Sequence, residues 1–500
     1  MPFSARVHPA PGPLRGEMRA PSSKNYTTRA ILLACLAEGR SVIRRPAVQD
    51  DAAALVRCAR QLGARLEALD AAGNAIEFSV PNASRVDALV VDGFGGKPSV
   101  PGPVVDPGNA GAVLRRLMGV AALVDGEVRF DTAHHKDSLG TRPNAGLLDA
   151  LRQLGVECDS PTDAGTLPVT IRGGRARIAA HLERRRREEG LAPGEPIPVR
   201  VSGALSSQFL SSLLYLAPLV GERLVLEVTG GLKSAPLVAL TRETIERAGV
   251  PLAPSDDLLR LVVEPGRYAA REALVNGDWP GAAALLAAAC VLPGSEIIVP
   301  GLVQDLQGER RCLDFSAQLG AASTFTSDGV HFRAPERLVG HGRIDGDQCT
   351  DAVLAMMGAA MLGDGASRFD GIANLQFKEC DRVRRPVLEL RRVDETGPPC
   401  GTAPAKWDDS AGAAWWEPHD DPATLFVNGR PEGFEGGIMV DGCGDHRVIM
   451  LLSIVALRCR RGLTIRGAHH VAKSFPGWFD QLRARGVAVD EIPTTELAHA

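Results

Sequence analysis

The sequence predicts an α/β protein of two domains, and three observations support this prediction. The chain has 500 residues, more than one hydrophobic core usually organises. An amphipathic helical stretch, followed at once by a short alternating apolar segment, recurs six times, as helix-to-strand units do. These units are spaced by roughly 70 to 95 residues, which is too long for solenoid repeats. Three units in each half indicate a duplicated α/β protein.

The six units follow one another along the whole chain. They begin at Leu55, Leu147, Thr241, Cys312, Val387 and Trp478, and the fifth is a degraded copy. In the other five, a glycine stands where the end of a helix needs a left-handed backbone, at Gly63, Gly155, Gly249, Gly320 and Gly486. We therefore expect a helix before each of these glycines and a strand after it.

A doubly wound nucleotide-binding fold would also alternate helices and strands, but its phosphate-binding loop is missing. No GxGxxG follows a predicted strand, and the nearest approach, Gly95-Gly96-Lys97-Pro98, is predicted to be an ordinary turn. The stretch from His181 to Pro196 indicates a solvated helix, and 396–421 indicates a loop or insertion that contains three tryptophans.

Composition excludes several classes of protein. The 56 basic and 60 acidic residues give a net charge of −4, which argues against a general nucleic-acid or membrane-surface binder. No window approaches 18 uninterrupted apolar residues, and the first residues lack the apolar core of a secretory signal, so we expect a cytoplasmic protein. The ten cysteines include no CxxC pair, so neither a zinc template nor a disulfide framework is predicted.

Seven short motifs combine charged residues with glycine or small hydroxyl residues beside apolar helices. They are Lys-x-x-x-x-Arg from Lys24, Asn-Ala-Gly from Asn109, Ser-Leu-x-x-Arg-Pro from Ser138, Ser-Ser-Gln-Phe from Ser206, Lys-Glu-x-Asp-Arg from Lys378, Asp-His-Arg from Asp445 and Lys-x-Phe-Pro from Lys473. In this order they resemble the enolpyruvyl transferase family, and the resemblance runs from about Pro21 to Phe479. One such motif is weak, whereas seven in order are specific.

The resemblance implies a fold and a reaction. The fold would be a two-domain inside-out α/β barrel of six βαβαββ repeats, with residues 22–276 as the first domain and residues 1–21 plus 277–500 as the second. The reaction would transfer the enolpyruvyl (carboxyvinyl) group of phosphoenolpyruvate to a hydroxyl of a phosphorylated acceptor, with shikimate 3-phosphate preferred. Only these two small molecules are expected as partners of a monomer, without nucleic acid, membrane, metal or organic cofactor.

Phosphoenolpyruvate carries a carboxylate and a phosphate, and arginine forks grip such oxyanions in bidentate fashion. By resemblance, Arg382 and Arg447 would hold the carboxylate, while Lys24, Arg142 and Lys473 would hold the phosphate. The other residues expected to line this pocket are Asn109, Gly111 and Gln208.

The acceptor side is implied in the same way. Ser206, Ser207 and Ser234 would bind the acceptor phosphate, with the first two at a helix start where free backbone N–H groups attract anions. The remaining acceptor-binding residues would be Asn25, Arg29, Gln208, Asp351, Asn374 and Lys378.

The reaction adds an alcohol to C2 while C3 gains a proton, and then loses phosphate as C3 returns a proton. Asp351 would act on the acceptor hydroxyl, Glu379 or Lys24 would exchange the proton at C3, and His446 would hydrogen-bond near Glu379. Which group protonates C3 stays open.

Departures from the family pattern lie mostly on the acceptor side. Asn25 replaces serine after the first lysine, Ala235 and Leu237 replace a basic and an aromatic residue, and Thr350 replaces proline before Asp351. Two alternatives therefore remain: the same chemistry on another acceptor, such as a hydroxyl of a UMP-type nucleotide, and a noncatalytic anion-binding relative.

Overall fold

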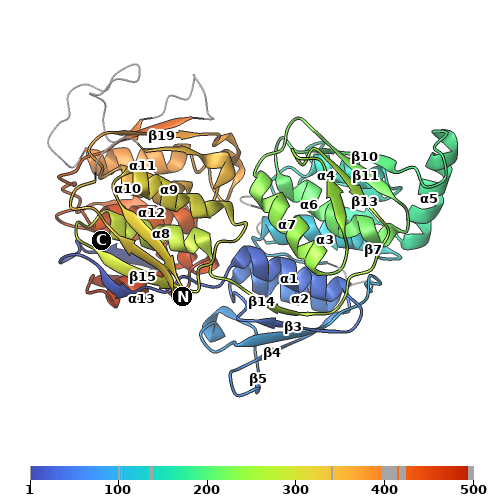
Figure 1. The fold of residues 1–500 in the computed structure, drawn as a ribbon, viewed down its shortest axis with the longest axis horizontal. Coiled ribbons are helices and arrows are strands. Elements are labelled where there is room, and N and C mark those ends of the chain that lie inside the picture. The colour runs from blue at the N-terminus through green and yellow to red at the C-terminus, as the bar shows by residue number, and fades with distance from the viewer. Residues whose placement is uncertain are drawn as a thin grey trace. The chain divides into compact units, whose positions relative to one another are not determined.

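A computed structural model describes residues 2–99, 102, 104–133, 139–338, 342–395, 414–415 and 424–493, and it shows a mixed α/β chain (Figure 1). Internal contacts divide the chain into two units. The first unit is Ser22–Val275, and the second unit is Met1–Pro21 together with Asn276–Ala500. The predicted α/β class is confirmed.

The first unit contains helices and strands in alternation. Its α-helices are α1 (Lys24–Leu36), α2 (Asp50–Gln61), α3 (Gly111–Ala121), α4 (Ala145–Arg152), α5 (Arg175–Glu188), α6 (Ser207–Leu216) and α7 (Ala235–Arg247). Its strands are β3 (Arg40–Arg44), β4 (Arg65–Leu69), β5 (Ala75–Ile76), β6 (Ala88–Asp92), β7 (Glu127–Phe130), β8 (Glu157–Asp159), β9 (Val169–Arg172), β10 (Ile197–Ser202), β11 (Leu224–Thr229), β12 (Leu252–Pro254), β13 (Arg260–Val263) and β14 (Glu272–Leu274).

The second unit is built in the same way. Its α-helices are α8 (Trp279–Cys290), α9 (Cys312–Gln318), α10 (Val353–Ala360), α11 (Arg384–Asp394), α12 (His446–Ala456) and α13 (Trp478–Arg483). Its strands are β1 (Phe3–Val7), β2 (Arg15–Glu17), β15 (Glu296–Pro300), β16 (Ala322–Thr326), β17 (Gly329–Arg333), β18 (Arg343–Asp345), β19 (Ala366–Asp370), β20 (Ala414–Trp415), β21 (Leu425–Asn428), β22 (Met439–Asp441), β23 (Leu463–Arg466) and β24 (Val489–Pro493). Three 3₁₀ turns matter for the site: η3 (Gly308–Arg311), η5 (Ala373–Phe377) and η6 (Ala468–Lys473).

The described strands form six sheets, three in each unit, and the sheets share one connectivity. In the sheet β10-β11-β13-β12, β10 and β11 are parallel, and β13 and β12 follow as antiparallel neighbours. The sheet β18-β19-β21-β20 repeats this pattern in the second unit. In the three-stranded sheet β7-β9-β8, the parallel pairing is a single isolated bridge between Val105 and Phe130 of β7. No sheet closes on itself among the described strands, so a closed barrel is not found.

The core of each unit is built from helices that are buried on all sides or almost all sides. Every residue of α8, α10 and α12 is buried, and these three helices pack against one another. In the first unit, α3 and α6 are buried along almost their whole length and also pack together. A helix without a polar face must be enclosed. Strands such as β3 and β7 alternate between buried and exposed residues, so their sheets have one face toward solvent.

Several of the motif residues lie at the first turns of helices. Each of these helices begins at a capping side chain, which accepts a hydrogen bond from a backbone N–H of the first turn. Ser23 caps α1 and accepts a hydrogen bond from the Tyr26 backbone N–H, and Ser206 caps α6 in the same way. Asp445 caps α12 by accepting from the Arg447 backbone N–H at 2.9 Å. Each cap sets the first residue of its helix and therefore the position of the motif side chains that follow it.

The local predictions agree with the structure in most places. All five glycines expected at helix ends have φ between 82° and 99°. Gly95 and Gly96 form a turn in which the Lys97 N–H donates to the Phe94 carbonyl at 3.0 Å. A solvated helix was expected from His181 to Pro196, and α5 confirms it only as far as Glu188, because residues 189–196 form turns and loop. In α5 the buried residues are Ile178 and Leu182.

The expected insertion at 396–421 lies outside the described residues except for two. Ala414–Trp415 form β20, which pairs with β21. The loop prediction is wrong for these two residues, because the edge of β21 offers them a ladder of hydrogen bonds. In the part of the chain that the structure describes, no helix combines the length and the apolar character that crossing a membrane requires.

Candidate active site

The second unit contains a buried cluster of charged side chains centred on Arg382. The Arg382 side chain is 2% exposed and makes three ion pairs. Its Nε lies 2.7 Å from Oδ2 of Asp445, its Nη2 lies 2.7 Å from Oε2 of Glu379, and its Nη1 lies 3.2 Å from Oδ1 of Asp351. One guanidinium therefore holds three carboxylates that come from three separate segments.

Two further cations extend this cluster. Arg447 Nη2 lies 3.0 Å from the other oxygen of Asp351, and Lys473 Nζ lies 2.8 Å from the other oxygen of Glu379. Arg447 Nε is buried and has no hydrogen-bond partner among the described residues. The cluster thus alternates cations and carboxylates, and it includes one buried donor, Arg447 Nε, that has no acceptor within the described part of the chain.

The charge on Arg382 results from two opposing effects. Burial disfavours the cation, but Asp445, Glu379 and Asp351 together outweigh burial and raise the pKa of Arg382 above its usual value. A fixed, always charged fork of this kind suits recognition of a carboxylate or phosphate.

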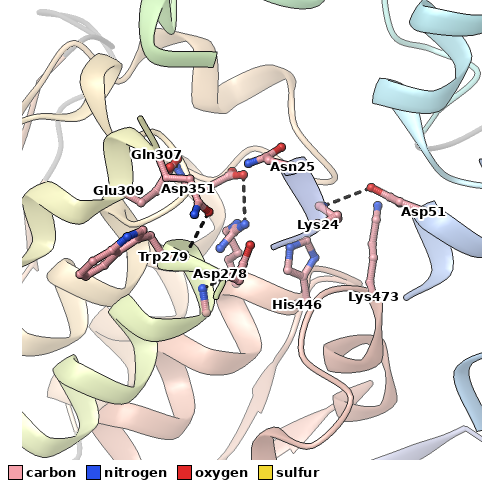
Figure 2. A network of polar contacts seen from close by, with 12 residues as sticks. Lys24, Asn25, Asp51, Asp278, Trp279, Gln307, Glu309, Asp351, His446 and Lys473 are labelled. Atoms are coloured by element: carbon pink, nitrogen blue, oxygen red, sulfur yellow. Dashed lines mark hydrogen bonds and ion pairs between the residues drawn. The ribbon is translucent and has the colours of Figure 1, made fainter. Parts of the chain in front are cut away.

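Glu309 on η3 lies beside Asp351 (Figure 2) and was missed by the sequence analysis. Its Oε1 accepts a hydrogen bond from the Asp351 backbone N–H at 3.3 Å, while its buried Oε2 has no hydrogen-bond partner among the described residues. Burial, followed by the neighbouring charge of Asp351, raises the pKa of Glu309 to about 7. The sequence carried no signal for it, because Gly-Glu-Arg-Arg is typical of a solvated turn.

The remaining candidates of the second unit lie around this cluster. His446 is the first residue of α12, and its buried ring has Nδ1 at 3.8 Å from Oδ1 of Asp445, which is beyond hydrogen-bond distance. Asn374 is buried in η5, and Lys378 is half-buried directly after it. Asp445 belongs to the Asp-His-Arg motif but was not among the predicted site residues, although its carboxylate holds Arg382.

In the first unit, Lys24 and Asp51 form an ion pair. Lys24 Nζ, at the start of α1, lies 3.1 Å from Oδ2 of Asp51, at the start of α2 (Figure 2). Both side chains are largely buried. Asp51 was missed because acidic residues in the first turn of a helix are common.

Arg115 connects the predicted anion-binding residues of the first unit and was also missed. It lies on α3 and donates from Nη1 to Oε1 of Gln208 at 2.9 Å and to Oγ of Ser206 at 3.3 Å. Its Nε donates to Oδ1 of Asn144 at 3.0 Å. Burial, and then the charge of Arg142, lower the pKa of Arg115 to about 9. The sequence did contain an indication of this role, because Arg115 is a charged residue within the otherwise largely apolar stretch 111–121.

The serine candidates occupy two helix starts. Ser206 accepts a hydrogen bond from the Gln208 backbone N–H at 3.2 Å, and Ser207 is the buried first residue of α6. Ser234 precedes α7 and adopts a left-handed backbone with φ of 53°. A helix start with a hydroxyl side chain can bind an oxyanion.

Arg29 is held in place by the protein itself. Its Nε donates to Oγ1 of Thr241, its Nη2 to the Leu237 carbonyl and its Nη1 to the Asn25 carbonyl, each at 2.9 Å. The bonds to Thr241 and Leu237 join α1 to α7, the bond to Asn25 lies within α1, and together the three orient the guanidinium.

Gly111 and Arg142 approach each other closely, and Asn109 lies two residues before Gly111. A Cβ atom added to Gly111 would lie 2.7 Å from Arg142 Nη1. Gly111 was expected to line the phosphoenolpyruvate pocket, and the structure shows that a side chain at this position would crowd Arg142.

Comparisons with known proteins cover nearly the whole chain. Residues 9–482 match the family model for EPSP synthase (3-phosphoshikimate 1-carboxyvinyltransferase). A 3-phosphoshikimate 1-carboxyvinyltransferase of Deinococcus radiodurans is 38% identical over 494 residues, with 99% of this chain and 98% of the relative covered. One of Methanosarcina acetivorans is 31% identical, with 97% of this chain and 99% of the relative covered.

Among solved structures, an EPSP synthase from Acinetobacter baumannii has a TM-score of 0.71, covering 98% of this chain and 99% of that chain at 18% identity. At this identity the likeness shows the fold.

Proposed function

The chain belongs to the EPSP synthase (3-phosphoshikimate 1-carboxyvinyltransferase) family, and we propose that it transfers the enolpyruvyl group of phosphoenolpyruvate to shikimate 3-phosphate. Phosphate is released by addition and elimination, in a step of the shikimate pathway to aromatic amino acids. The observation that carries this proposal is the buried cluster in which Arg382, Arg447 and Lys473 surround Asp351 and Glu379. A noncatalytic relative would have no need to bury this combination.

The proposed architecture is six βαβαββ repeats with helices inside and sheets outside. The shared strand connectivity of the sheets and the complete burial of α8, α10 and α12 support it. The first unit would be the first enolpyruvyl transferase domain (22–276), and the second unit the second domain (1–21 plus 277–500).

Both units contribute to the proposed phosphoenolpyruvate-binding set. In the second unit, Arg382 and Arg447 would bind the carboxylate, and the buried Nε of Arg447 provides a donor for it. Lys473 would bind the phosphate. In the first unit, Lys24 and Arg142 would bind the phosphate, with Asn109, Gly111 and Gln208 lining the pocket. Binding an anion at buried cations is strong because little water screens the charges.

The proton transfers are assigned to two carboxylates of the cluster. Asp351 would accept the proton of the acceptor hydroxyl as its oxygen attacks C2, and Arg382 and Arg447 hold both oxygens of Asp351 in position. Glu379 would exchange the proton at C3, with Lys473 at 2.8 Å to neutralise its charge. Lys24 is the alternative proton donor at C3, and His446 would hydrogen-bond near Glu379.

The acceptor phosphate would lie at Ser206, Ser207 and Ser234, beside Gln208. Arg115 holds Ser206 and Gln208 and supplies positive charge beneath them. Arg29, with Asn25, would bind the acceptor carboxylate, and Asp351, Asn374 and Lys378 would contact its hydroxyls. The monomeric state and the cytoplasmic location remain predictions.

An assay of phosphate release tests the acceptor. Wild-type protein is incubated with phosphoenolpyruvate and either shikimate 3-phosphate or UMP. We expect turnover with shikimate 3-phosphate on the order of 10 s⁻¹ and none with UMP. Asn25→Ser, which restores the family's serine, should leave kcat/KM unchanged or raise it. Turnover with UMP alone would replace shikimate 3-phosphate with a nucleotide acceptor, and no turnover with either would reject the acceptor assignment.

Gly111→Ala tests the phosphoenolpyruvate pocket. The added Cβ would lie 2.7 Å from Arg142 Nη1, so the guanidinium must move. Because small displacements of a binding group are costly, KM for phosphoenolpyruvate should rise by about ten-fold or more, while KM for the acceptor changes less. Steady-state kinetics with each substrate varied in turn measures this.

Gly12→Ala is the matched control, since its Cβ would meet nothing within 4 Å. It should behave as wild type. An unchanged KM for phosphoenolpyruvate in Gly111→Ala would remove Arg142 from the phosphate site.

A further inference from the structure

The first unit contains a pocket that the proposed reaction does not use. It is bounded by α1, α7, β3 and β14, and none of the residues that line it has a role in that reaction. Its volume is about 60 Å³, which is room for roughly four to six water-sized groups. Most of its wall is apolar, and this part includes Leu33, Ala34, Ile43, Ala248, Ala273 and Val275. Such a wall suits the apolar body of a small molecule.

Three polar side chains interrupt the apolar wall. Arg271, directly before β14, is half-buried, and its side chain donates from Nε to the Glu272 carbonyl at 3.4 Å but makes no ion pair with the described residues. Arg247, the last residue of α7, is 53% exposed and pairs with Glu243. The Ser41 hydroxyl, which is 1% exposed, accepts the Arg271 backbone N–H at 3.2 Å and has no acceptor of its own within the described part of the chain. One guanidinium of the wall thus lacks a carboxylate partner.

The electrostatics of this wall favour an anion. Burial, followed by the charge of Arg247, lowers the pKa of Arg271. An anion beside Arg271 would oppose both effects. A carboxylate can accept from the fork of an arginine through two oxygens, and the Ser41 O–H is a further donor.

We propose that this pocket binds a small monocarboxylate whose apolar body has about six carbon atoms, with the body enclosed by α1, α7, β3 and β14 and the carboxylate held by Arg271 and Ser41. The size of the body follows from the volume, at one carbon for each water-sized group. A single negative charge is expected because Glu243 already neutralises Arg247. Benzoate is a probe of this class.

The pocket shares two helices with the proposed acceptor site, so a ligand should affect that site if the proposed function is correct. Tyr26 and Ala30 line the pocket from α1, which also carries Arg29. Thr244 lines it from α7, one turn after the Thr241 hydroxyl that accepts from Arg29 Nε. Because the pocket exists while Arg29 is held in this orientation, a ligand that fills it should favour the orientation. We expect KM for shikimate 3-phosphate to fall by about five-fold, while KM for phosphoenolpyruvate changes less.

Binding to the full chain is measured by ligand-observed NMR titration with benzoate, benzamide and acetate. Benzamide keeps the ring without the charge, and acetate keeps the charge without the ring. We expect benzoate to bind with a Kd on the order of 1 mM and the other two at least about ten-fold more weakly. Equal binding of benzamide would reject the contact with the carboxylate, and equal binding of acetate would reject the apolar pocket, so either result would overturn the inference.

Two variants test whether benzoate lies in this pocket. Arg271→Gln removes the cation, and Ala273→Leu fills the pocket with a larger side chain, so each should weaken benzoate binding by about ten-fold or more. Arg65→Gln and Ala75→Leu are the matched controls, because both positions are exposed on the same sheet and neither lines the pocket. Thermal denaturation without ligand checks that each variant is folded. Benzoate binding that both pocket variants leave unchanged would overturn the inference.

Competition separates this pocket from the proposed active site. Benzoate should stay bound in titrations with saturating shikimate 3-phosphate or saturating phosphoenolpyruvate, and displacement by either substrate would place benzoate at the reaction site and overturn the inference. Binding that requires Arg271 in a protein that never turns over shikimate 3-phosphate would support the pocket and reject the proposed function. Binding without a change in KM would overturn the effect on the acceptor site alone.

Discussion

Arg382→Ala is expected to lower the free energy of unfolding by about 3–5 kcal/mol, the scale for removing one partner of a buried ion pair. The substitution would leave Asp445, Glu379 and Asp351 close together without the guanidinium that contacts all three. The first two of these carboxylates are almost fully buried, so water cannot replace the lost charge. Urea denaturation of the wild type and the variant at the same pH measures the difference.

The same substitution should also remove about 2–4 kcal/mol of transition-state stabilisation, because the carboxylate of phosphoenolpyruvate loses a desolvated partner. Arg15→Ala is the matched control in the same unit. Its side chain is 63% exposed and lies 3.8 Å from Glu296, so its loss should cost at most about 1 kcal/mol and leave kcat/KM unchanged. Equal costs in the two variants would show that the cluster does not stabilise the protein.

The sequence predicted those parts of the fold that depend on neighbouring residues. The amphipathic helices and the left-handed glycines that end them are local features, so Gly63 and Gly320 could be assigned before the structure was known. The pairing of strands is not local. β10 and β11 lie side by side although α6 lies between them in the sequence, and no spacing of apolar residues specifies that partnership or its register.

The residues of the candidate site also fall into two groups: those carried by local motifs, which could be predicted, and those brought in by tertiary contacts, which could not. Asp351, Glu379 and Arg382 were predicted because short motifs carry them, and the structure places all three in one cluster. Residues that contact these three only through the tertiary fold were missed. Glu309 reaches Asp351 from 42 residues away, and the pattern around it resembles that of a solvated turn.

Arg115 is the exception, because its signal was present in the sequence. A charged side chain within the apolar stretch 111–121 must find polar partners when that helix is buried. Four partners are found in the structure: the side chains of Asn144, Ser206 and Gln208 and the carbonyl of Pro143. A search for arginines on buried helices would therefore have added this residue to the acceptor side of the site.

The pH dependence of stability provides the second large effect, through Glu309. Burial and the neighbouring Asp351 raise its pKa from 4.5 to about 7. Between these two values the folded protein binds a proton that the unfolded chain releases, so this group's contribution to the free energy of unfolding falls as the pH rises through that window. Below pH 4.5 the group is protonated in both states, and above about pH 7 the loss is complete.

Glu309→Gln should remove this dependence, because the amide keeps an oxygen to accept the Asp351 N–H but does not titrate. The stability of the variant relative to the wild type should therefore increase between pH 5 and pH 8, by an amount on the order of 1–3 kcal/mol. Urea denaturation of both proteins at several pH values measures this difference. Glu296→Gln, which removes a carboxylate whose side chain is 57% exposed, is the matched control and should show a much smaller change. If the difference for Glu309→Gln stays constant across this range, the carboxyl does not titrate there, and Asp351 has a permanently charged neighbour.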